Sequence, residues 1–216
     1  MPITKNTNNN DCIIVFAKAP IPGEVKTRMI PAFGAENAAL LHTALVERVL
    51  ETATRTGAIV ELCCAPDASH SFFAVCTEDF GVTLSEQGQG NLGERMLRAL
   101  DDTLATCDRA ILIGADCPAF TPKHLQRALQ ALDDADVVLT PADDGGFVLV
   151  GARRTAAGMF IGIEWGTHQV LDTQRARLAA CGLTWHEMET LWDVDRPADL
   201  ERLRQLQPPL AYTFAT

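Results

Sequence analysis

The feature that most constrains the fold is a short apolar run that ends in an acid. Residues 110–114 read Ala-Ile-Leu-Ile-Gly, and Ala115, Asp116, Cys117 and Pro118 follow them. The run is too short for a helix and shows no polar alternation, which is typical of a strand buried on both faces of a parallel sheet. Ligands in open α/β sheets bind outside the carboxyl ends of such strands. Asp116 is therefore the first candidate for a functional carboxylate.

The rest of the chain alternates strand-like and helix-like segments. Further strands are expected at 13–17, 58–64, 82–84, 136–141, 147–152 and 183–189. Helical patterns lie between and after them, from about Ala35 to Gly57, over 96–104, from Thr121 with Pro122 at the first helical position, over 167–181 with Thr167 as N-cap, and over 200–206. This alternation predicts βαβ units with right-handed crossovers, and hence a three-layer α/β/α fold with a mostly parallel sheet.

The composition favours one domain without a membrane span. With 216 residues, 47% of them hydrophobic, and no internal linker, the chain is expected to form a flexible tail over 1–11 and a single domain over 12–210. The apolar runs are only as long as strands, so no membrane span is expected. The first residues are polar and unlike a signal peptide, and a cytoplasmic location is therefore expected. Seven cysteines without C-x-x-C spacing predict reduced, mostly buried thiols. No pattern in the sequence sets the oligomeric state.

The charge pattern points to a small anionic ligand. A formal net charge of −10 argues against nucleic-acid binding, which needs a basic face to replace phosphate counterions. However, Lys18, Lys26 and Arg28 fall within the loop that follows the first strand, with Gly23 between them. Lysine supplies a point charge and arginine a bidentate fork, so this loop suits a di- or triphosphate. A solvated loop with ordinary surface charges is the alternative.

This loop lacks the two common phosphate-binding motifs. A Walker A loop has a glycine directly before its lysine, and Val25 stands at that place here. The G-x-G-x-x-G fingerprint of dinucleotide-binding proteins is absent as well. A P-loop NTPase is therefore disfavoured.

A second acidic cluster lies near the other end of the chain. Asp193 and Asp195 follow a predicted strand and precede a predicted helix, so the sheet could bring them close to Asp116. Mg²⁺ and Mn²⁺ bind through one or two carboxylates together with substrate phosphates and waters, which makes Asp116, Asp195 and Asp193 the predicted metal ligands. Capping or turn roles for Asp116 and Asp195 are the alternatives. An aspartyl-phosphate phosphatase is disfavoured, because its D-x-D pair would follow the first strand.

Between two predicted strands lies a turn that combines acids with flexible backbone, Asp143-Asp144-Gly145-Gly146. Asp144 is a candidate catalytic base, and Asp143, Gly145 and Gly146 are candidates for the acceptor side of the site. A plain hairpin turn explains the same residues equally well. His42 lies on a predicted helix without ligand spacing, so no chemistry is assigned to it.

Five separated motifs occur in order along the chain. They are Phe16-Ala17-Lys18-Ala19-Pro20-x-Pro22-Gly23-x-Val25-Lys26-Thr27-Arg28, Asn91-Leu92-Gly93-Glu94-Arg95-Met96, Gly114-Ala115-Asp116-Cys117-Pro118, Asp144-Gly145-Gly146-Phe147 and Asp193-Val194-Asp195-x-Pro197-x-Asp199-Leu200. Together they resemble the DUF2064 group of proteins, described as transferase 1 proteins associated with radical-SAM and selenium domains or as arsenosugar-biosynthesis-type glycosyltransferases. The match runs from about Ile13 to Leu206.

The resemblance implies the GT-A, or nucleotide-diphospho-sugar transferase, architecture, which guanylyl- and cytidylyltransferases share. It also implies roles by position. Nucleotide phosphates would be held by Lys18, Lys26 and Arg28, and the metal by Asp116 first and Asp195 second, with Asp193 in reserve. Arg196 departs from the family's usual threonine, which removes an expected N-cap beside Asp195.

Together these features predict a metal-dependent transferase that uses Mg²⁺ or Mn²⁺ and a nucleotide-activated donor. The leading hypothesis is sugar transfer from a nucleoside diphosphate sugar to a small-molecule acceptor, with Asp144 as the base and Asp116 at the metal. A nucleotidyltransferase that releases pyrophosphate is the alternative, because both reactions build negative charge beside a divalent ion and fixed cations. A nucleotide-binding protein without catalytic activity is the alternative from another class.

Overall fold

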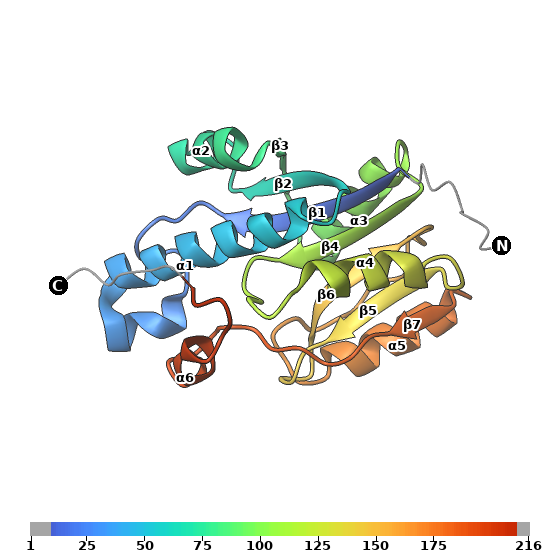
Figure 1. Ribbon diagram of the computed structural model, residues 1–216. Helices are drawn as coiled ribbons and strands as arrows, with labels where there is room; N and C mark the ends of the chain where they lie inside the picture. Colours follow the sequence, from blue (N-terminus) through green and yellow to red (C-terminus); the bar gives the residue numbers. More distant parts are fainter. Residues whose placement is uncertain (1–9, 211–216) are drawn as a thin grey trace.

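A seven-stranded sheet forms the centre of the protein, which the computed structural model describes over residues 10–210. In sheet order the strands are β3 (Thr83–Glu86), β2 (Ile59–Ala65), β1 (Asp11–Lys18), β4 (Arg109–Gly114), β6 (Phe147–Ala152), β5 (Val137–Pro141) and β7 (Trp185–Glu187). Every pairing is parallel except the two made by β6. The predicted mostly parallel sheet is therefore confirmed (Figure 1).

Helices cover both faces of this sheet (Figure 1). One face carries α1 (Ile30–Thr54), α2 (Ser71–Phe80) and α4 (Pro122–Ala131), and the other carries α3 (Leu92–Leu104) and α5 (Val170–Ala180). The alternation along β1 explains this arrangement. Ile13 and Val15 belong to the core beneath the first group of helices, whereas Ile14 and Phe16 belong to the core beneath the second. A continuous apolar strand is buried on both faces only between two such layers.

A third, smaller core holds the end of the chain against the start of α1. The short helix α6 (Asp199–Arg204) contributes Leu203, which packs in one cluster with Val194 and with Met29 of the 3₁₀ turn η1 (Thr27–Met29). Figure 1 shows α6 near the first turns of α1. The acids on either side of Val194 are therefore held next to the loop that follows β1.

Two elements differ from the expectations drawn from the sequence. No helix was expected at α2, where Phe73 and Cys76 alone are fully buried and leave too short a stripe to recognise. The helix predicted over 167–181 begins instead at Val170, so the prediction of Thr167 as its N-cap was wrong. Thr167 Oγ1 donates to the main-chain oxygen of Glu164 at 2.9 Å, a contact within the preceding loop.

The cysteines follow the prediction. All seven are free, and five of them are buried. Cys63 and Cys64 belong to the cores on opposite faces of the sheet. Of the tail predicted over 1–11, residues 1–9 lie outside the described residues, and Asp11 is already the first residue of β1. Over residues 10–210, no helix combines the length and the apolarity that crossing a membrane requires.

Candidate functional site

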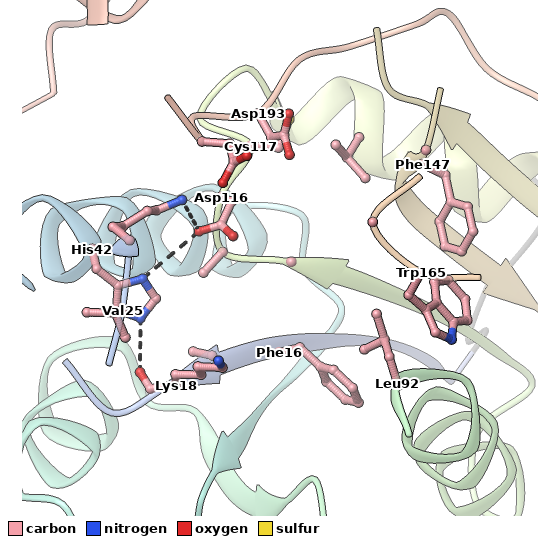
Figure 2. A pocket seen from close by; sticks show the side chains of 18 of the residues that line it. Phe16, Lys18, Val25, His42, Leu92, Asp116, Cys117, Phe147, Trp165 and Asp193 are labelled. Atoms are coloured by element: carbon pink, nitrogen blue, oxygen red, sulfur yellow. Dashed lines mark hydrogen bonds and ion pairs between the residues drawn. The ribbon is translucent and has the colours of Figure 1, made fainter. Parts of the chain in front are cut away.

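A cavity of about 690 Å³ opens at the carboxyl ends of β1 and β4. These strands lie at the switch point of the sheet, because β2 and β3 extend it on one side of β1 and β4 lies on the other side. Ligand-binding crevices of open α/β sheets occur at this place. Figure 2 shows charged side chains at one end of the cavity and aromatic side chains at the other.

The cavity brings together most of the candidate residues from the sequence. Its lining includes Lys18, Lys26, Arg28, Asp116, Asp144, Gly146, Asp193 and Asp195. The candidates Gly23, Asp143 and Gly145 are not among the described residues that line it. The carboxylate of Asp143 instead pairs with Arg202 of α6 at 2.5 Å.

Asp116 is paired with Lys26. The Lys26 ammonium lies 2.5 Å from Asp116 Oδ1 and donates to the main-chain oxygen of Val194, also at 2.5 Å. The Lys26 side chain is 4% exposed, whereas the Asp116 side chain is 50% exposed. Burial alone would raise the pKa of Asp116, but the charge and the hydrogen bond of Lys26 outweigh burial and hold that pKa below its usual value.

The segment that carries Asp193 and Asp195 is attached to the end of β4. The Val194 N–H donates to the main-chain oxygen of Asp116 at 2.9 Å. The Asp195 carboxylate forms an ion pair with Arg28. Two acids from distant parts of the chain are thus joined to one cationic loop.

Asp199 fixes the backbone of the segment that carries Asp195. Its carboxylate accepts hydrogen bonds from the Asp195 N–H at 2.9 Å and from the Arg196 N–H at 2.7 Å. Both donors precede α6, whose own N-terminus has no side-chain cap. The geometry of Asp195 is therefore set by an aspartate one turn further along the chain.

Asp193 and Asp116 face the same opening of the cavity (Figure 2). Burial raises the pKa of Asp193 to about 6, and the negative charges of Asp144 and Asp116 add to this effect. The acids around Asp193 thus create a negative potential that a divalent cation would relieve.

The residues fit a divalent cation that phosphate oxygens help to hold. Asp116 Oδ1 is buried against the Lys26 ammonium, but half of the Asp116 side chain is exposed, so its other oxygen can reach a cation in the cavity. Within residues 10–210, no three His, Cys, Asp or Glu side chains gather into a complete metal site. Mg²⁺ and Mn²⁺ commonly use one or two carboxylates and complete their coordination with phosphates and waters. Asp116 together with Asp193 or Asp195 meets that requirement.

His42 of α1 is a residue of the site that the sequence did not reveal. Its Nε2 lies 3.0 Å from the main-chain oxygen of Lys18, so Nε2 carries the proton and donates. Its Nδ1 faces Asp116 Oδ1 at 4.0 Å (Figure 2). Burial lowers the pKa of His42, so the ring is neutral near pH 7. A single histidine on a helix has no spacing signal that would have indicated this position.

Gln87 and Arg95 also line the cavity without having been proposed from the sequence. Gln87 is buried, and its Nε2 donates to the main-chain oxygen of Cys63 at 3.1 Å. Its Oε1 accepts from Arg95 Nη1 at 2.8 Å. Arg95 belongs to the motif Asn91-Leu92-Gly93-Glu94-Arg95-Met96, and its place in that motif was the one sign in the sequence that could have indicated a role in the site.

The turn between β5 and β6 presents Asp144 to the cavity. Asp144 Oδ1 accepts from the Gly146 N–H at 2.9 Å. Gly145 has a φ of 91°, and a Cβ at this position would lie 2.3 Å from the main-chain oxygen of His168. Glycine is therefore required where the turn meets the loop before α5. The turn therefore joins β5 and β6 as a hairpin and also places Asp144 and Gly146 at the wall of the cavity.

The far end of the cavity is apolar. Phe16, Leu92, Phe147 and Trp165 lie there (Figure 2). The rings of Phe147 and Trp165 meet edge to face, with centroids 6.1 Å apart. Such a surface desolvates an apolar group or the face of a ring. The cavity thus combines a charged end with an apolar end.

Comparison with known proteins places the chain in a family. A family model described as an uncharacterized protein conserved in bacteria (DUF2064) matches residues 48–167. A proposed nucleotide-diphospho-sugar transferase from Desulfovibrio desulfuricans G20 is 29% identical and superimposes with a TM-score of 0.82, over 93% of this chain and 90% of that one. The comparison with curated proteins gave no match.

More distant solved structures share the fold. CMP:2-keto-3-deoxy-manno-octonic acid synthetase in complex with CTP is 14% identical, with a TM-score of 0.60 over 92% of this chain and 98% of that one. Glucosyl-3-phosphoglycerate synthase from Mycobacterium tuberculosis, solved with Mn²⁺, UDP and glucosyl-3-phosphoglycerate, is 10% identical, with a TM-score of 0.55 over 91% of this chain and 76% of that one. The predicted nucleotide-diphospho-sugar transferase architecture is therefore confirmed.

Proposed function

The chain belongs to the DUF2064 family of bacterial proteins, and we propose that it is a divalent-metal-dependent transferase acting on a nucleotide-activated donor. Its fold is that of nucleotide-sugar transferases and nucleotidyltransferases. The observation that carries the proposal is the cavity in which Lys18 and Arg28 lie with the carboxylates of Asp116 and Asp195. Fixed cations and carboxylates that hold a metal ion together match the charge of a diphosphate.

We infer that the reaction is glycosyl transfer from a nucleoside diphosphate sugar to a small acceptor. As the bond between the sugar and the phosphate oxygen breaks, negative charge grows on the diphosphate leaving group. Lys18 and Arg28 stabilise that charge more than they stabilise the ground state. An Mg²⁺ or Mn²⁺ ion held by Asp116 and Asp195, with Asp193 in reserve, would supply Lewis-acid stabilisation of the same oxygens.

Asp144 is the proposed base for the acceptor. Its Oδ1 is held by the Gly146 N–H, which leaves Oδ2 to accept the proton of an acceptor hydroxyl as that oxygen attacks the sugar. Asp144 is exposed at the cavity, so an acceptor can reach it. The rings of Phe147 and Trp165 would cover the face of the sugar or of the acceptor.

Nucleotidyl transfer is the second candidate, because a synthetase solved with CTP shares the fold over 92% of this chain. In that reaction an acceptor phosphate attacks the α-phosphorus of a nucleoside triphosphate, and pyrophosphate leaves. The same cations would stabilise the leaving group. The two reactions therefore differ in their products rather than in the charges that they require.

A two-step experiment tests these proposals. Nucleoside di- and triphosphates and nucleotide sugars are first compared in a thermal-shift panel with and without Mn²⁺, since a ligand that binds only the native protein raises its melting temperature. The stabilising donor is then incubated with acceptors. Release of nucleoside diphosphate supports glycosyl transfer, and release of pyrophosphate supports nucleotidyl transfer. Binding without turnover would indicate a non-catalytic protein, and no binding of any nucleotide would contradict the proposal.

A further inference from the structure

The three cations Lys18, Lys26 and Arg28, which lie at the end of β1 and in the segment after it, differ in what they contact. Lys18 is exposed, and the Arg28 side chain is 57% exposed, so both reach solvent in the cavity. The Lys26 side chain is 4% exposed, and its ammonium contacts Asp116 Oδ1 and the main-chain oxygen of Val194. The charge of Lys26 is therefore directed at the protein's own acid rather than at the open cavity.

The backbone at Lys26 fixes this placement. Its φ of 48° is left-handed, and between residues 10 and 210 no other non-glycine residue has a positive φ. A lysine adopts this conformation at a cost, and it persists where the surroundings determine it. Val25 and Met29, which are both buried, anchor the loop on either side of Lys26. The direction of the Lys26 side chain is thus built into the fold.

Among the described residues, Lys26 is the one positive charge in direct contact with Asp116. The other close ionisable group is His42, whose Nε2 donates to the main-chain oxygen of Lys18. The His42 nitrogen that faces Asp116 lies farther away, at 4.0 Å. Lys26 is therefore the cation that pairs directly with this carboxylate.

We propose that Lys26 is a positioning residue that occupies Asp116 until a phosphate-bearing substrate arrives, so that a divalent cation binds weakly alone and tightly with the substrate. This inference rests on the proposed function, in which Asp116 holds the metal. A divalent cation at Asp116 would lie close to the Lys26 ammonium, and like charges repel strongly in a partly buried site. Phosphate oxygens give Lys26 another partner and complete the coordination of the cation. The two ligands are therefore positively coupled.

Binding of Mn²⁺ in the absence of any nucleotide tests the inference. Wild-type protein, Lys26→Met and Lys18→Met are titrated with Mn²⁺ while the electron paramagnetic resonance signal of the free ion is followed. Both variants remove one positive charge from the cavity, but only Lys26 contacts Asp116. Lys26→Met is expected to bind Mn²⁺ at least about tenfold more tightly than wild type, a coupling of ordinary size. Lys18→Met is expected to change the dissociation constant by less than about threefold, because charges that are not in contact are screened.

The result can overturn the inference in three ways: Lys26→Met shows no gain, Lys18→Met shows an equal gain, or none of the three proteins binds Mn²⁺. If Lys26→Met does not fold, Lys26→Gln replaces it and must show the same gain, because glutamine keeps a donor for Val194 and removes the charge. Failure of the proposed function is seen separately, as the absence of any stabilising nucleotide in the thermal-shift panel of the wild-type protein.

Discussion

Individual side chains in the cavity contribute differently to stability and to binding. Arg28 and Asp195 form an ion pair, although 57% and 41% of their side chains are exposed. An exposed pair of this kind contributes about 0–1 kcal/mol to stability. Within the proposed function, however, Arg28 presents a bidentate fork to the phosphates, and lysine or methionine cannot replace that geometry.

We therefore expect Arg28→Met to leave the protein folded and to impair binding. The free energy of unfolding in urea should change by less than about 1 kcal/mol. Calorimetry should show nucleoside diphosphate binding weakened by about tenfold or more, the effect of losing a charge-assisted hydrogen bond. Arg55→Met is the control, because Arg55 is an exposed arginine that pairs with Glu51 on α1 and does not line the cavity. An equal loss of affinity in both variants would contradict a phosphate contact for Arg28.

Asp144 and Asp143 are adjacent acids with separate expected roles. Asp144→Asn should lower turnover by about 10²–10⁴-fold while leaving nucleotide affinity unchanged, because it removes the base without removing a phosphate contact. Asp143 pairs with Arg202 and is not part of the cavity lining, so Asp143→Asn should keep wild-type turnover. Release of nucleoside diphosphate under saturating donor is the measurement. Similar turnover in the two variants would remove Asp144 from the mechanism.

For single residues, the sequence indicated which side chains lie together in the cavity but not which of them form ion pairs or hydrogen bonds with each other. Acids at strand ends were recognisable, because parallel strands bring their carboxyl ends to one edge of the sheet. The pairing of Lys26 with Asp116 depends on a left-handed backbone at Lys26, which the spacing of residues does not predict. His42 reaches the site through the packing of α1, and only the folded structure shows this.

The secondary-structure elements were predictable where their apolar pattern was long. The strands and the long stripe of α1 were placed close to their observed bounds, because hydrophobic period and burial agree there. In α2, only two fully buried residues mark the inner face, too few for a recognisable period. The start of α5 was misplaced, because Gln169 provides no side-chain cap that could mark it.

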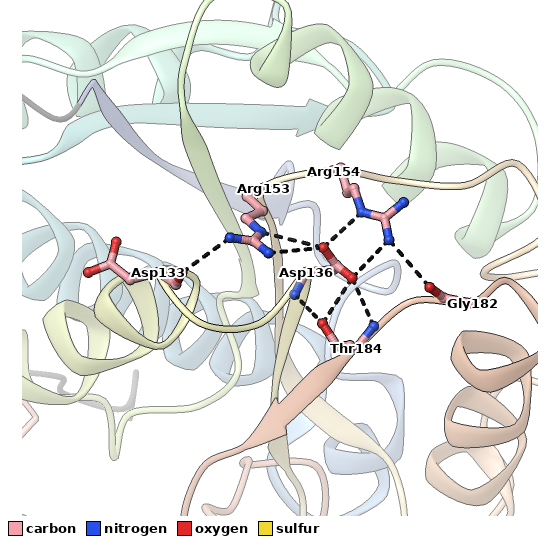
Figure 3. A network of polar contacts seen from close by, with 6 residues as sticks. All are labelled: Asp133, Asp136, Arg153, Arg154, Gly182 and Thr184. Atoms are coloured by element: carbon pink, nitrogen blue, oxygen red, sulfur yellow. Dashed lines mark hydrogen bonds and ion pairs between the residues drawn. The ribbon is translucent and has the colours of Figure 1, made fainter.

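Asp136 ties together three segments at the opposite end of the sheet (Figure 3). Its carboxylate accepts from Arg154 Nε at 2.8 Å and from the Thr184 N–H and hydroxyl at 2.9 Å each, with Arg153 nearby. The Asp136 side chain is 6% exposed. The hydrogen bond from Arg154, together with those from Thr184, holds the pKa of Asp136 well below its usual range despite burial. A carboxyl with a lowered pKa stabilises the fold fully above its unfolded pKa, and this contribution is lost progressively as pH falls from that value through the folded pKa.

Asp136→Asn should therefore destabilise the protein in a pH-dependent way. At pH 7 the free energy of unfolding should fall by about 3 kcal/mol, because Arg153 and Arg154 lose the acid that they surround. Below about pH 4, where the carboxyl of the unfolded chain becomes protonated, the difference in free energy of unfolding between the variant and the wild type should become smaller. Urea unfolding between neutral and acid pH measures both effects. Asp134→Asn, an exposed acid two residues earlier, should change stability by less than about 0.5 kcal/mol. A gap that stays constant with pH would contradict this account of Asp136.

Across the whole molecule, the site depends on a small core outside the main sheet. Lys26 and the end of β4 both contact Val194, and the cluster that contains Leu203 and Met29 holds Val194 in place. The two large cores beneath the sheet do not contain Val194. A truncated side chain in the small core should therefore weaken nucleotide binding more than an equal truncation in one of the two large cores.

Leu203→Ala and Leu178→Ala test this dependence as a matched pair. Leu203 is 2% exposed in the small core, and Leu178 of α5 is fully buried in a large one. Each truncation leaves a cavity and should lower the free energy of unfolding by about 2–5 kcal/mol. Leu203→Ala should also weaken binding of the nucleotide with Mn²⁺ by about tenfold, because local opening around α6 displaces Asp193 and Asp195. Calorimetry at a temperature where both variants are folded measures the affinities. Equal affinities would mean that the contacts of Val194 with Lys26 and Asp116 suffice to hold the acids, with no contribution from α6.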